Sequence, residues 1–374
     1  MIKNIFFQIF SMLYFATFGQ QLQLDKIGYI PDVAEECSGI ALLPSGHLAM
    51  INDSGNDPEV FITTTDGDLI KSIYLPDACN IDWEAAVYHN GHLYIGDFGN
   101  NDNERKDLVV LKYKITPSDS IYNQQIIKFR YANQREFPPD RDKQNFDTEA
   151  MIHYRDSIFV FTKNRTRPFS GYTYVYGMPD VPDSYILAPL DSFRTGVGEK
   201  DYWWITDAAL SPDGKKLVLL GYDKLWLFED FKGTEFFSGI SQVYALGWLS
   251  QKESITFFTD SELLITDELN RFGGGKIYHT QLDPPDEFEV KVGPKEFQSF
   301  VKIELTAKAE SKVRYEVFNT KGKRIDAGTL PDNTTDHKID TRAYPPGGYV
   351  FSILLGEKPF QAFKLKKLYT KSDT

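Results

Sequence analysis

The sequence predicts an all-β protein, namely a β-propeller of five blades, or alternatively six, followed by a small immunoglobulin-like β-sandwich. The main observation is a recurring pattern of an acidic residue, a short apolar strand, a tight turn and a second short strand. Its first strands start near residues 38, 84, 149, 207 and 253. Units of about 40 to 50 residues with four strands each are typical of propeller blades. The content of 21 Tyr and 28 Phe fits a chain rich in strands.

The clearest copy of the pattern runs from Asp82 to Arg105. The segment Asp82-Trp83-Glu84 opens an apolar strand, a turn follows at 89–92, and the second strand ends on Asp97. The two strands of a hairpin are antiparallel, so the start of the first and the end of the second lie at the same edge. Asp82, Glu84 and Asp97 are therefore expected to be neighbours in space.

Four strands are assigned to each expected blade in chain order. Blade one has strands near 38–43, 47–52, 59–64 and 69–75, and blade two has strands near 84–89, 92–97, 107–115 and 125–131. Blade three has strands near 149–154, 157–163, 172–177 and 184–193, and blade four has strands near 207–211, 216–222, 224–229 and 242–249. Blade five has only three, near 253–258, 263–267 and 275–281. Residues 22–30 are expected to supply its outer strand and close the ring. In the six-bladed alternative, the long piece 178–206 holds another blade.

Four regions are expected along the chain. Residues 1–19 have the form of a secretory signal peptide, with a basic residue before an apolar run. The propeller follows at 20–283, a linker that begins with two prolines at 284–294, and the sandwich at 295–374. No later stretch is long and apolar enough to span a membrane. The mature protein is therefore expected outside the cytoplasm and not membrane-spanning.

Charge is distributed unevenly along the chain. The net charge of −12 argues against nucleic acid as a partner. Residues 290–374 carry 16 Lys and Arg against 10 Asp and Glu, whereas residues 1–289 carry 25 against 43. This opposite balance suggests two domains, of which the acidic one has a cation as partner. The alternative is an acidic surface that contacts only solvent. The protein is expected to be a monomer.

The two cysteines each precede the first strand of a blade. Neighbouring blades bring Cys37 and Cys79 to the same rim. In an oxidising compartment a disulfide between them is expected. Two free thiols are the alternative, because a bridge requires Cα atoms about 6 Å apart.

The face of the propeller on which the inner strands begin collects acidic side chains. The candidate metal ligands on it are Asp53, Asp82, Glu84, Asp97, Asp147, Glu149, Asp207 and Glu253. So many carboxylates around a narrow channel cannot all stay ionised and unpaired. Such hard oxygen ligands suit a divalent cation, calcium first and magnesium next. The alternative is that each acid caps N–H groups of the neighbouring inner strand.

Basic and amide side chains follow on the same face. Four of them are candidate ligand-binding residues, namely Arg105, Lys163, Asn164 and Arg165. A divalent cation beside Arg and Lys can recognise the phosphate or carboxylate of a small anionic ligand. The alternative is that these cations only form salt bridges with the nearby acids.

The C-terminal region resembles the C-terminal sorting domain of type IX secretion cargo in Bacteroidetes-type bacteria. The matching segments are Tyr315-Glu316-Val317-Phe318-Asn319, Gly322-Lys323, Ile339-Asp340-Thr341, Gly347-Gly348-Tyr349 and Lys364-Leu365-Lys366. The resemblance implies that the type IX secretion machinery exports the protein, after periplasmic transit, to the medium or the cell surface. The polar tail at 369–374 departs from the family pattern, which leaves removal of the domain open. An ordinary immunoglobulin-like accessory domain is the alternative.

The propeller is similar to secreted propellers of the phytase-like, gluconolactonase-like (SMP-type) and NHL-type group. The similarity is carried by Asn52-Asp53-Ser54-Gly55-Asn56, Asp82-Trp83-Glu84, Ile95-Gly96-Asp97-Phe98-Gly99-Asn100-Asn101, Phe161-Thr162-Lys163-Asn164 and Ile205-Thr206-Asp207-Ala208. Related enzymes of that group bind a divalent metal in the central channel. The resemblance therefore implies a metal without assigning a role to any single ligand.

Two functional classes remain. In the first, the protein is a secreted binding or interaction module whose channel is structural or holds calcium. In the second, it is a metal-dependent hydrolase of a phosphoester, a lactone or a similar anionic substrate, with a channel Glu or Asp as base. The sequence has no Gly-x-Ser-x-Gly elbow, zinc-binding spacing or phosphate-binding loop. This favours the first class, assigns no catalytic residue and leaves open whether the protein is an enzyme.

Overall fold

The computed structural model describes residues 20–269, 273–282, 290–305, 312–320, 322–331, 334–355 and 358–368. The chain divides into two compact units, one at Gln21–Leu282 and one that holds the described residues from Val290 onward. The expected signal peptide at 1–19 and most of the expected linker lie outside the described residues. Strand β23 (Val290–Gly293) nevertheless falls within the linker range, so the ordered part of the second unit begins at Val290.

The described residues of the first unit form five sheets, and the strands of each follow in order from the innermost outward. The first sheet contains β3 (Cys37–Leu42), β4 (Leu48–Asn52), β5 (Glu59–Thr63) and β6 (Leu69–Tyr74). The second sheet contains β7 (Trp83–His89), β8 (His92–Asp97), β9 (Val109–Ile115), β10 (Ile121–Tyr131) and β14 (Ser184–Leu187). The third is β11 (Asp147–Tyr154), β12 (Ser157–Lys163), β13 (Tyr172–Pro179), β15 (Asp191–Arg194). The fourth sheet contains β16 (Asp207–Leu210), β17 (Lys216–Leu220), β18 (Lys224–Glu229), β19 (Ile240–Ala245) and β1 (Gln20–Gln21). The fifth sheet contains β20 (Lys252–Phe257), β21 (Glu262–Asp267), β22 (Lys276–Gln281) and β2 (Asp25–Tyr29).

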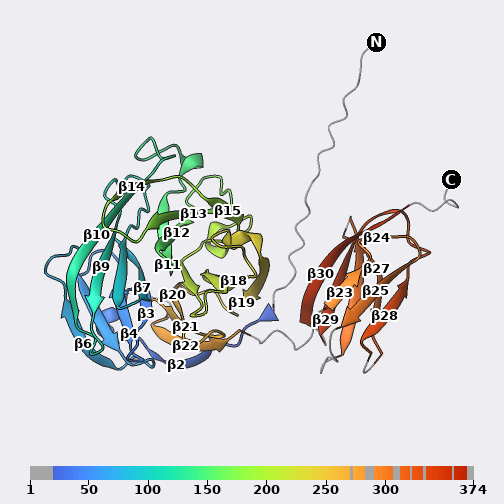
Figure 1. Cartoon of the computed structure of the whole chain (residues 1–374), viewed down its shortest axis with the longest axis horizontal. Coiled ribbons are helices and arrows are strands. Elements are labelled where there is room, and N and C mark those ends of the chain that lie inside the picture. Colours follow the sequence, from blue (N-terminus) through green and yellow to red (C-terminus); the bar gives the residue numbers. More distant parts are fainter. Residues whose placement is uncertain are drawn as a thin grey trace, which may run out of the picture. The chain divides into compact units, whose positions relative to one another are not determined.

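The inner strands of these sheets form a closed ring, in which β3 packs on β7, β7 on β11, β11 on β16, β16 on β20, and β20 on β3 (Figure 1). Apolar side chains fill the space between each neighbouring pair of sheets, so the core is divided into five clusters in the described residues. Between the first and second sheets, for example, Trp83 is fully buried against Ile51 and Leu111. Strands buried on both faces read as continuous apolar runs, as in β4. The predicted class, a β-propeller, is confirmed.

The N-terminal segment closes the ring as expected. Strand β2 pairs antiparallel with β22, with Lys26 opposite Tyr278, and so supplies the outer strand of the last sheet. The preceding residues reach one sheet further, because β1 joins β19 and Leu22 N–H donates to the Ala245 carbonyl at 2.9 Å. This segment therefore ties the fourth and fifth sheets together, and it covers the outer edge of each.

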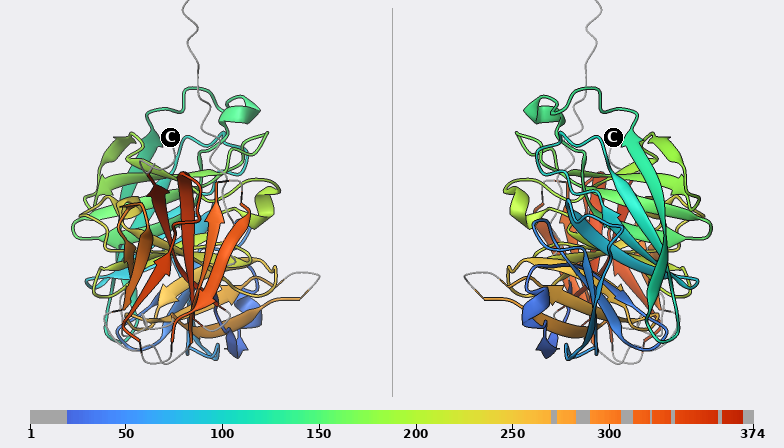
Figure 2. Two further views of the ribbon diagram at one scale, coloured as in Figure 1. Left: turned by 90° about the vertical axis from the view of Figure 1, so that its right-hand side faces the viewer. Right: turned by 90° about the vertical axis from the view of Figure 1, so that its left-hand side faces the viewer.

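One expected strand belongs to a different sheet. The sequence predicts 184–193 as the outer strand of blade three, but β14 pairs in parallel with β10 of the second sheet, and β15 alone pairs with β13. The reason is that the outer edge of β10 is open along its second half, and β14 covers it. The piece 178–206 thus contributes strands to these two sheets. Figure 2 shows the neighbouring loop between β10 and β11, which contains the 3-10 turn η2 (Arg141–Lys143), projecting beyond the sheets.

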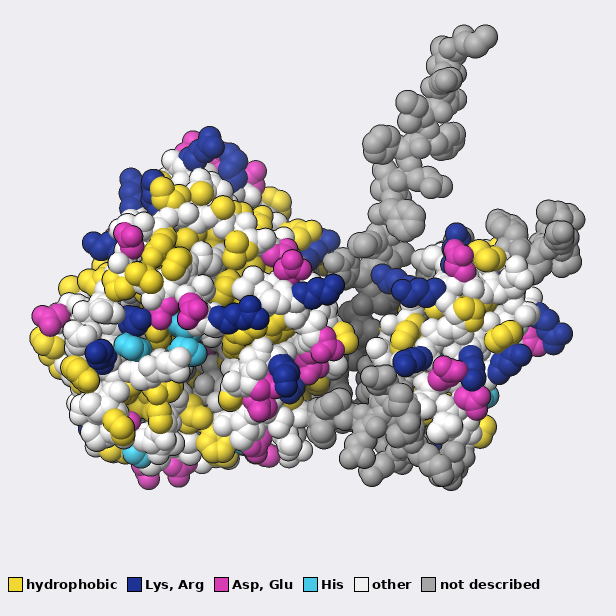
Figure 3. All heavy atoms as spheres, in the orientation of Figure 1, with side chains coloured by type: hydrophobic (Ala, Val, Ile, Leu, Met, Phe, Trp, Pro, Cys, Tyr) yellow, Lys and Arg dark blue, Asp and Glu magenta, His cyan; other side chains and the backbone are white. Residues whose placement is uncertain are grey.

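The second unit is a small β-sandwich. One sheet contains β23, β25 (Phe300–Leu305) and β28 (Asp336–Asp340), and the other contains β24 (Glu296–Phe297), β30 (Lys358–Lys367), β29 (Gly347–Leu355), β26 (Val313–Asn319) and β27 (Arg324–Thr329). Alternating side chains of both sheets, such as Val301, Ile303, Val317 and Phe351, form one buried core. Basic side chains are prominent on the face of this unit shown in Figure 3, in keeping with its predicted positive balance.

The expected disulfide is absent, because Cys37 and Cys79 are both free. Cys37 is fully buried in β3, where its Sγ lies 3.9 Å from both Ser254 Oγ and Thr266 Oγ1. Cys79 is exposed in the loop before β7. The Cys37 side chain thus points toward the fifth sheet while Cys79 lies on the side of the second, and burial raises the pKa of the Cys37 thiol to about 11. No helix in the described residues is long and apolar enough to cross a membrane.

Candidate functional site

A β-bulge recurs at the start of four inner strands. In β7, Trp83 pairs with Asp97 and Ala85 with Gly96, which leaves Glu84 without a partner in the ladder. The same shift of register leaves out Ser38 in β3, Glu149 in β11 and Glu253 in β20. A bulge bends its strand and re-aims the extra side chain. All four extra residues line a single cavity at the mouth of the channel.

This cavity has a volume of about 240 Å³ and is mostly polar. It is lined by Glu36, Cys37, Ser38, Asp53, Glu84, Asn101, Glu149, Lys163, Arg165, Tyr222, Gln251, Glu253 and Glu268. Of the twelve residues predicted to bind a metal or a ligand, six line it, namely Asp53, Glu84, Glu149, Lys163, Arg165 and Glu253. Half of the predicted site residues therefore line the cavity itself.

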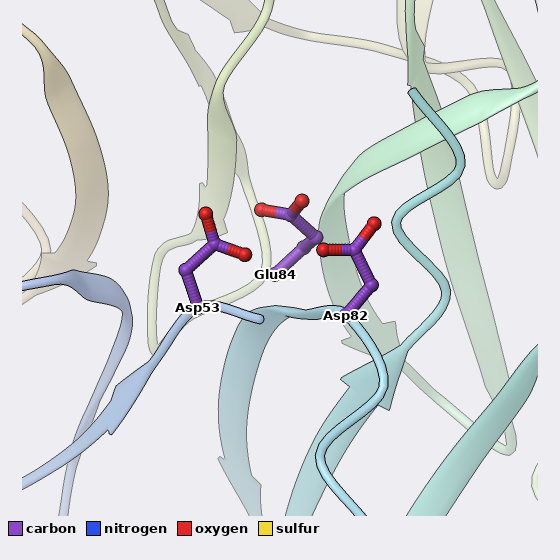
Figure 4. Close-up of side chains that lie close together, drawn as sticks. All are labelled: Asp53, Asp82 and Glu84. Carbon is purple, nitrogen blue, oxygen red and sulfur yellow. The ribbon is translucent and has the colours of Figure 1, made fainter. Parts of the chain in front are cut away.

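Three predicted metal ligands form a tight cluster at one side of the cavity. Carboxylate oxygens of Asp53, Asp82 and Glu84 lie within 4.8 Å of one another, and Figure 4 shows the three groups converging from the end of β4 and the start of β7. Asp82 is 8% exposed, and its Oδ1 is buried without a hydrogen-bond partner among the described residues. Burial, and next the charge of Asp53, raise the pKa of Asp82 to about 7. Burial also raises the pKa of Glu84 well above its usual range.

A glycine makes room for this cluster. A Cβ at Gly99 would lie 2.4 Å from Asp82 Cγ and 2.6 Å from Glu84 Oε1, far inside van der Waals contact. The loop after β8 approaches the carboxylates this closely because Gly99 N–H donates to the Asp82 carbonyl at 3.1 Å. Any side chain at this position would displace the carboxylates.

On the other side of the cavity the acids are paired with basic side chains. Lys163 Nζ lies 2.8 Å from Glu149 Oε2 and 4.0 Å from Glu253 Oε2. Arg165 contacts Asp147 at 2.5 Å and Glu149 at 3.1 Å. Burial alone would lower the pKa of Lys163, but Glu149 and Glu253 raise it well above its usual range. Lys163 and Arg165 therefore act as internal counter-ions for this half of the channel.

Four other predicted residues, Asp97, Arg105, Asp207 and Asn164, form bonds within the propeller framework outside the cavity. Asp97 forms a salt bridge with Arg105 at 2.9 Å, and neither residue lines the cavity. Asp207 accepts hydrogen bonds from Ala208 N–H and Ile255 N–H, both at 2.7 Å, and so joins β16 to β20. The Asn164 amide donates to Ser170 Oγ at 2.6 Å and to the Tyr172 carbonyl at 2.8 Å, within its own loop. Asp207 lacks the bulge of the other inner strands, so its carboxylate stays with the backbone.

The cavity also contains residues that the sequence analysis did not select, notably Tyr222, Gln251 and Glu268. Gln251 stands two positions before Glu253, as Asp82 stands before Glu84 and Asp147 before Glu149, so this spacing could have identified it. Glu268 follows β21 directly, at the strand end that carries Asp53 after β4. Burial, and next the charge of Glu253, raise the pKa of Glu268 to about 7.

The polar atoms that line the cavity determine which ions it can bind. Apart from Lys163 and Arg165, its polar lining offers mainly carboxylate, amide and hydroxyl oxygens, and the cluster of Asp53, Asp82 and Glu84 offers carboxylate oxygens alone. Oxygen donors of this kind suit hard cations such as calcium and magnesium, whereas softer transition metals favour His and Cys ligands.

Comparison with known proteins identifies the second unit. Residues 294–365 match the family described as "Secretion system C-terminal sorting domain". The chain ends in a type IX secretion sorting domain. The protein is therefore secreted by this system, to the cell surface or the extracellular medium. No curated protein matches the sequence.

Solved structures similar to the chain include several propellers. The PQQ-bound aldose sugar dehydrogenase of Streptomyces coelicolor has 9% identity and a TM-score of 0.44, over 70% of this chain and 98% of that chain. PorZ of Porphyromonas gingivalis, a surface component of the type IX secretion system, has 12% identity and a TM-score of 0.33, over 88% and 51%. The Cps50 (Swd1) β-propeller domain of Myceliophteria thermophila has 13% identity and a TM-score of 0.33, over 66% and 83%. Likeness at this level concerns the fold, and no function is carried over.

Proposed function

We propose that this secreted protein is a ligand-binding module whose propeller channel holds one divalent cation, calcium in the first place, at Asp53, Asp82 and Glu84. The observation that carries the proposal is the uncompensated charge of this cluster. Its oxygens lie within 4.8 Å of one another, and no salt bridge in the described residues reaches any of the three carboxylates. A buried carboxylate without a partner is costly, and a bound cation removes that cost.

Calcium is the preferred cation because of the geometry it accepts. It takes six to eight oxygen ligands in flexible arrangements, whereas magnesium demands a near-ideal octahedron. Three carboxylates supply at most six oxygens, and the cavity beside them can supply water or ligand oxygens for the remaining positions. A cation held there would present open coordination positions to a ligand in the cavity.

The proposal is tested with the full chain after removal of divalent ions by EDTA. Calorimetric titration should show one calcium site, and calcium at a hundredfold excess over Kd should stabilise the fold by about 2.7 kcal/mol. For a unit of this size that corresponds to a rise in Tm of about 5 to 10 °C. Asp82→Asn and Glu84→Gln should abolish both effects, whereas Asp57→Asn, an exposed acid in the same loop as Asp53, should change neither.

The opposite result has a clear form. If calcium and magnesium neither bind nor raise Tm, and Asp82→Asn strongly destabilises the protein in EDTA, the carboxylates serve only as structural hydrogen-bond acceptors. The proposal that the channel binds a cation would then be wrong.

One observation supports a second candidate function, the metal-dependent hydrolase. Glu268 lines the cavity and has a pKa of about 7, the range in which a general base works best near neutral pH. A panel of phosphoesters and lactones, assayed with calcium, tests this candidate. Turnover that Glu268→Gln abolishes without weakening calcium binding would support the hydrolase, and no turnover of any substrate would leave the binding module.

A further inference from the structure

We infer that Glu36, Glu253 and Glu268 form a second subsite in this cavity, which binds the primary ammonium group of a ligand with an apolar stem. The inference rests on the proposed function, because it assigns a ligand class to the cavity beside the proposed cation. It concerns the three lining carboxylates that neither that cation nor a basic side chain fully neutralises.

In the charge balance of the cavity, these three carboxylates have no full counter-charge. Six carboxylates and two basic side chains line it. The proposed cation accounts for Asp53 and Glu84, and Glu149 is engaged by both Lys163 and Arg165. Among the described residues, the only salt bridge to the remaining three is the one from Lys163 to Glu253, at 4.0 Å. A further positive charge is therefore favourable in this half of the cavity.

Neutral donors hold each of these carboxylates in place. The Asn56 amide donates to Glu36 at 2.6 Å, the Tyr222 hydroxyl to Glu253 at 3.1 Å, and the Gln251 amide to Glu268 at 2.7 Å. Neutral donors orient a carboxylate without cancelling its charge, so the remaining lone pairs are available to a charged donor. An ammonium group carries three N–H donors and one positive charge, which matches three such acceptors.

Glu84, which the proposed cation would neutralise, also shows that this cavity favours positive charge. Glu84 lines the same cavity, is only 6% exposed and has no hydrogen-bond or ion-pair partner among the described residues. Burying an unpaired carboxylate is unfavourable unless a cation or a proton compensates it. The protein's own side chains thus leave Glu84 to the proposed cation, and they leave Glu36, Glu253 and Glu268 as the carboxylates open to a second positive charge.

Exposed apolar side chains lie next to these acids along the chain. Val33, Trp248, Leu249 and Leu269 are 46%, 47%, 48% and 44% exposed. Each belongs to a loop that also carries Glu36, Gln251 or Glu268, and Leu269 N–H donates to the Glu35 carbonyl at 3.0 Å, which joins two of these loops. The Trp248 ring also packs edge-to-face on Tyr278. Exposed apolar side chains in the loops that carry these acids suit a ligand that buries its charge in the cavity and lays an apolar stem along those loops.

The size of the cavity limits the ligand. Its volume of about 240 Å³ corresponds to about eight water molecules. That space holds an ammonium group and a short alkyl chain, and it excludes a folded partner. The same head group can come from a free alkylamine or from a lysine side chain of a peptide, and the experiment distinguishes these sources.

The test is calorimetric titration of the calcium-saturated full chain with hexylammonium chloride. Binding should weaken about tenfold or more in Glu253→Gln and in Glu268→Gln, because each loses a charge-assisted hydrogen bond. Glu262→Gln is the matched control, because Glu262 begins β21 and Glu268 follows the opposite end of the same strand. Binding should not change in this variant. Ethylammonium, which lacks the stem, and hexanol, which lacks the charge, should each bind at least tenfold more weakly. Equal binding of N-acetyl-lysine amide identifies a peptide side chain as the source, and weaker binding identifies a free amine.

Three results would overturn the inference, namely no binding of hexylammonium, equal binding of hexanol, or unchanged binding in both variants. Repeating the titration in EDTA separates this inference from the proposed function. If calcium does not bind but hexylammonium still does, with the same dependence on Glu253 and Glu268, the ammonium subsite is supported and the proposed cation site is wrong. If Asp82→Asn abolishes ammonium binding in EDTA and Glu268→Gln does not, the ammonium occupies the cluster of Asp53, Asp82 and Glu84, and the subsite is wrong.

Discussion

Calcium binding should release protons, because the cluster cannot carry three full charges without a cation. Two ionised carboxylates whose oxygens lie within 4.8 Å of each other repel by at least about 3.5 kcal/mol at an effective dielectric constant of about 20. Since one pKa unit corresponds to about 1.4 kcal/mol, one such repulsion raises a carboxyl pKa by about 2.5 units, from about 4 to about 6.5. Burial adds to this effect and, together with the charge of Asp53, brings the pKa of Asp82 to about 7.

The perturbation is therefore a change of pH from 8 to 6. A single group with a pKa near 7 must lose its proton before calcium binds, so the calcium Kd should rise about tenfold over this range. Glu84, whose pKa is raised well above its usual range, increases the effect further. Titration at pH 6, 7 and 8 in two buffers of different ionisation enthalpy measures both Kd and the number of protons released. The reasoning is refuted if Kd is equal at pH 6 and 8 and the heat does not depend on the buffer.

The calcium-free protein should show the same titration in its stability. The folded state holds the Asp82 proton up to about pH 7, whereas the unfolded chain loses it near pH 4, so the folded state binds more protons between these values. The contribution to the free energy of unfolding is present below pH 4 and is lost as the pH rises through 7. Urea denaturation in EDTA should show this decline, and Asp82→Asn should flatten it.

Four other predictions follow from the contacts described. Gly99→Ala should weaken calcium binding at least about tenfold in calorimetry, because its Cβ would meet Asp82 and Glu84, and an unchanged Kd would show that the cluster does not bind the ion. Asp207→Ala should lower the free energy of unfolding by at least about 2 kcal/mol with or without calcium, because it leaves two buried N–H groups unpaired. A loss of stability restricted to the calcium-loaded form would instead show that Asp207 acts in the cation site. Cys79 should react with a thiol reagent in the native protein and Cys37 only after unfolding, so two fast thiols would contradict the burial of β3. Deleting 290–374 should leave a propeller with native thermal unfolding that stays in the periplasm, and its normal release to the medium would argue against the sorting role.

The sequence predicted the propeller because the same strand-turn-strand pattern recurs five times. It predicted the acidic mouth of the channel because hairpin geometry brings strand ends together. It could not distinguish Glu84 from Asp207, since both are acids at the start of an inner strand. The difference is a β-bulge, which aims Glu84 into the cavity and is absent at Asp207. A bulge depends on the pairing partner, and the spacing of acids along one strand does not contain that information.

Other differences also arose from contacts between distant segments. The position of β14 beside β10 depends on an open edge more than 50 residues earlier in the chain, which local patterns do not reveal. The direction of the Cys37 side chain depends on the alternation of β3, and that alternation turns it toward the fifth sheet and away from Cys79. Glu268 became part of the cavity because the fifth sheet returns beside the first, which only ring closure determines. The face on which the acids gather was thus predictable, and the particular partners of side chains from distant segments were not.

The way the ring closes also sets an order of events during folding. The pairing of Lys26 with Tyr278 joins residues roughly 250 positions apart, so it requires nearly the whole propeller sequence to be available for folding. Until then, β2 has no strand to pair with, and the last sheet has an open edge. We therefore expect this seam to assemble last and to open first, so hydrogen exchange should be fastest along the pairing of β2 with β22.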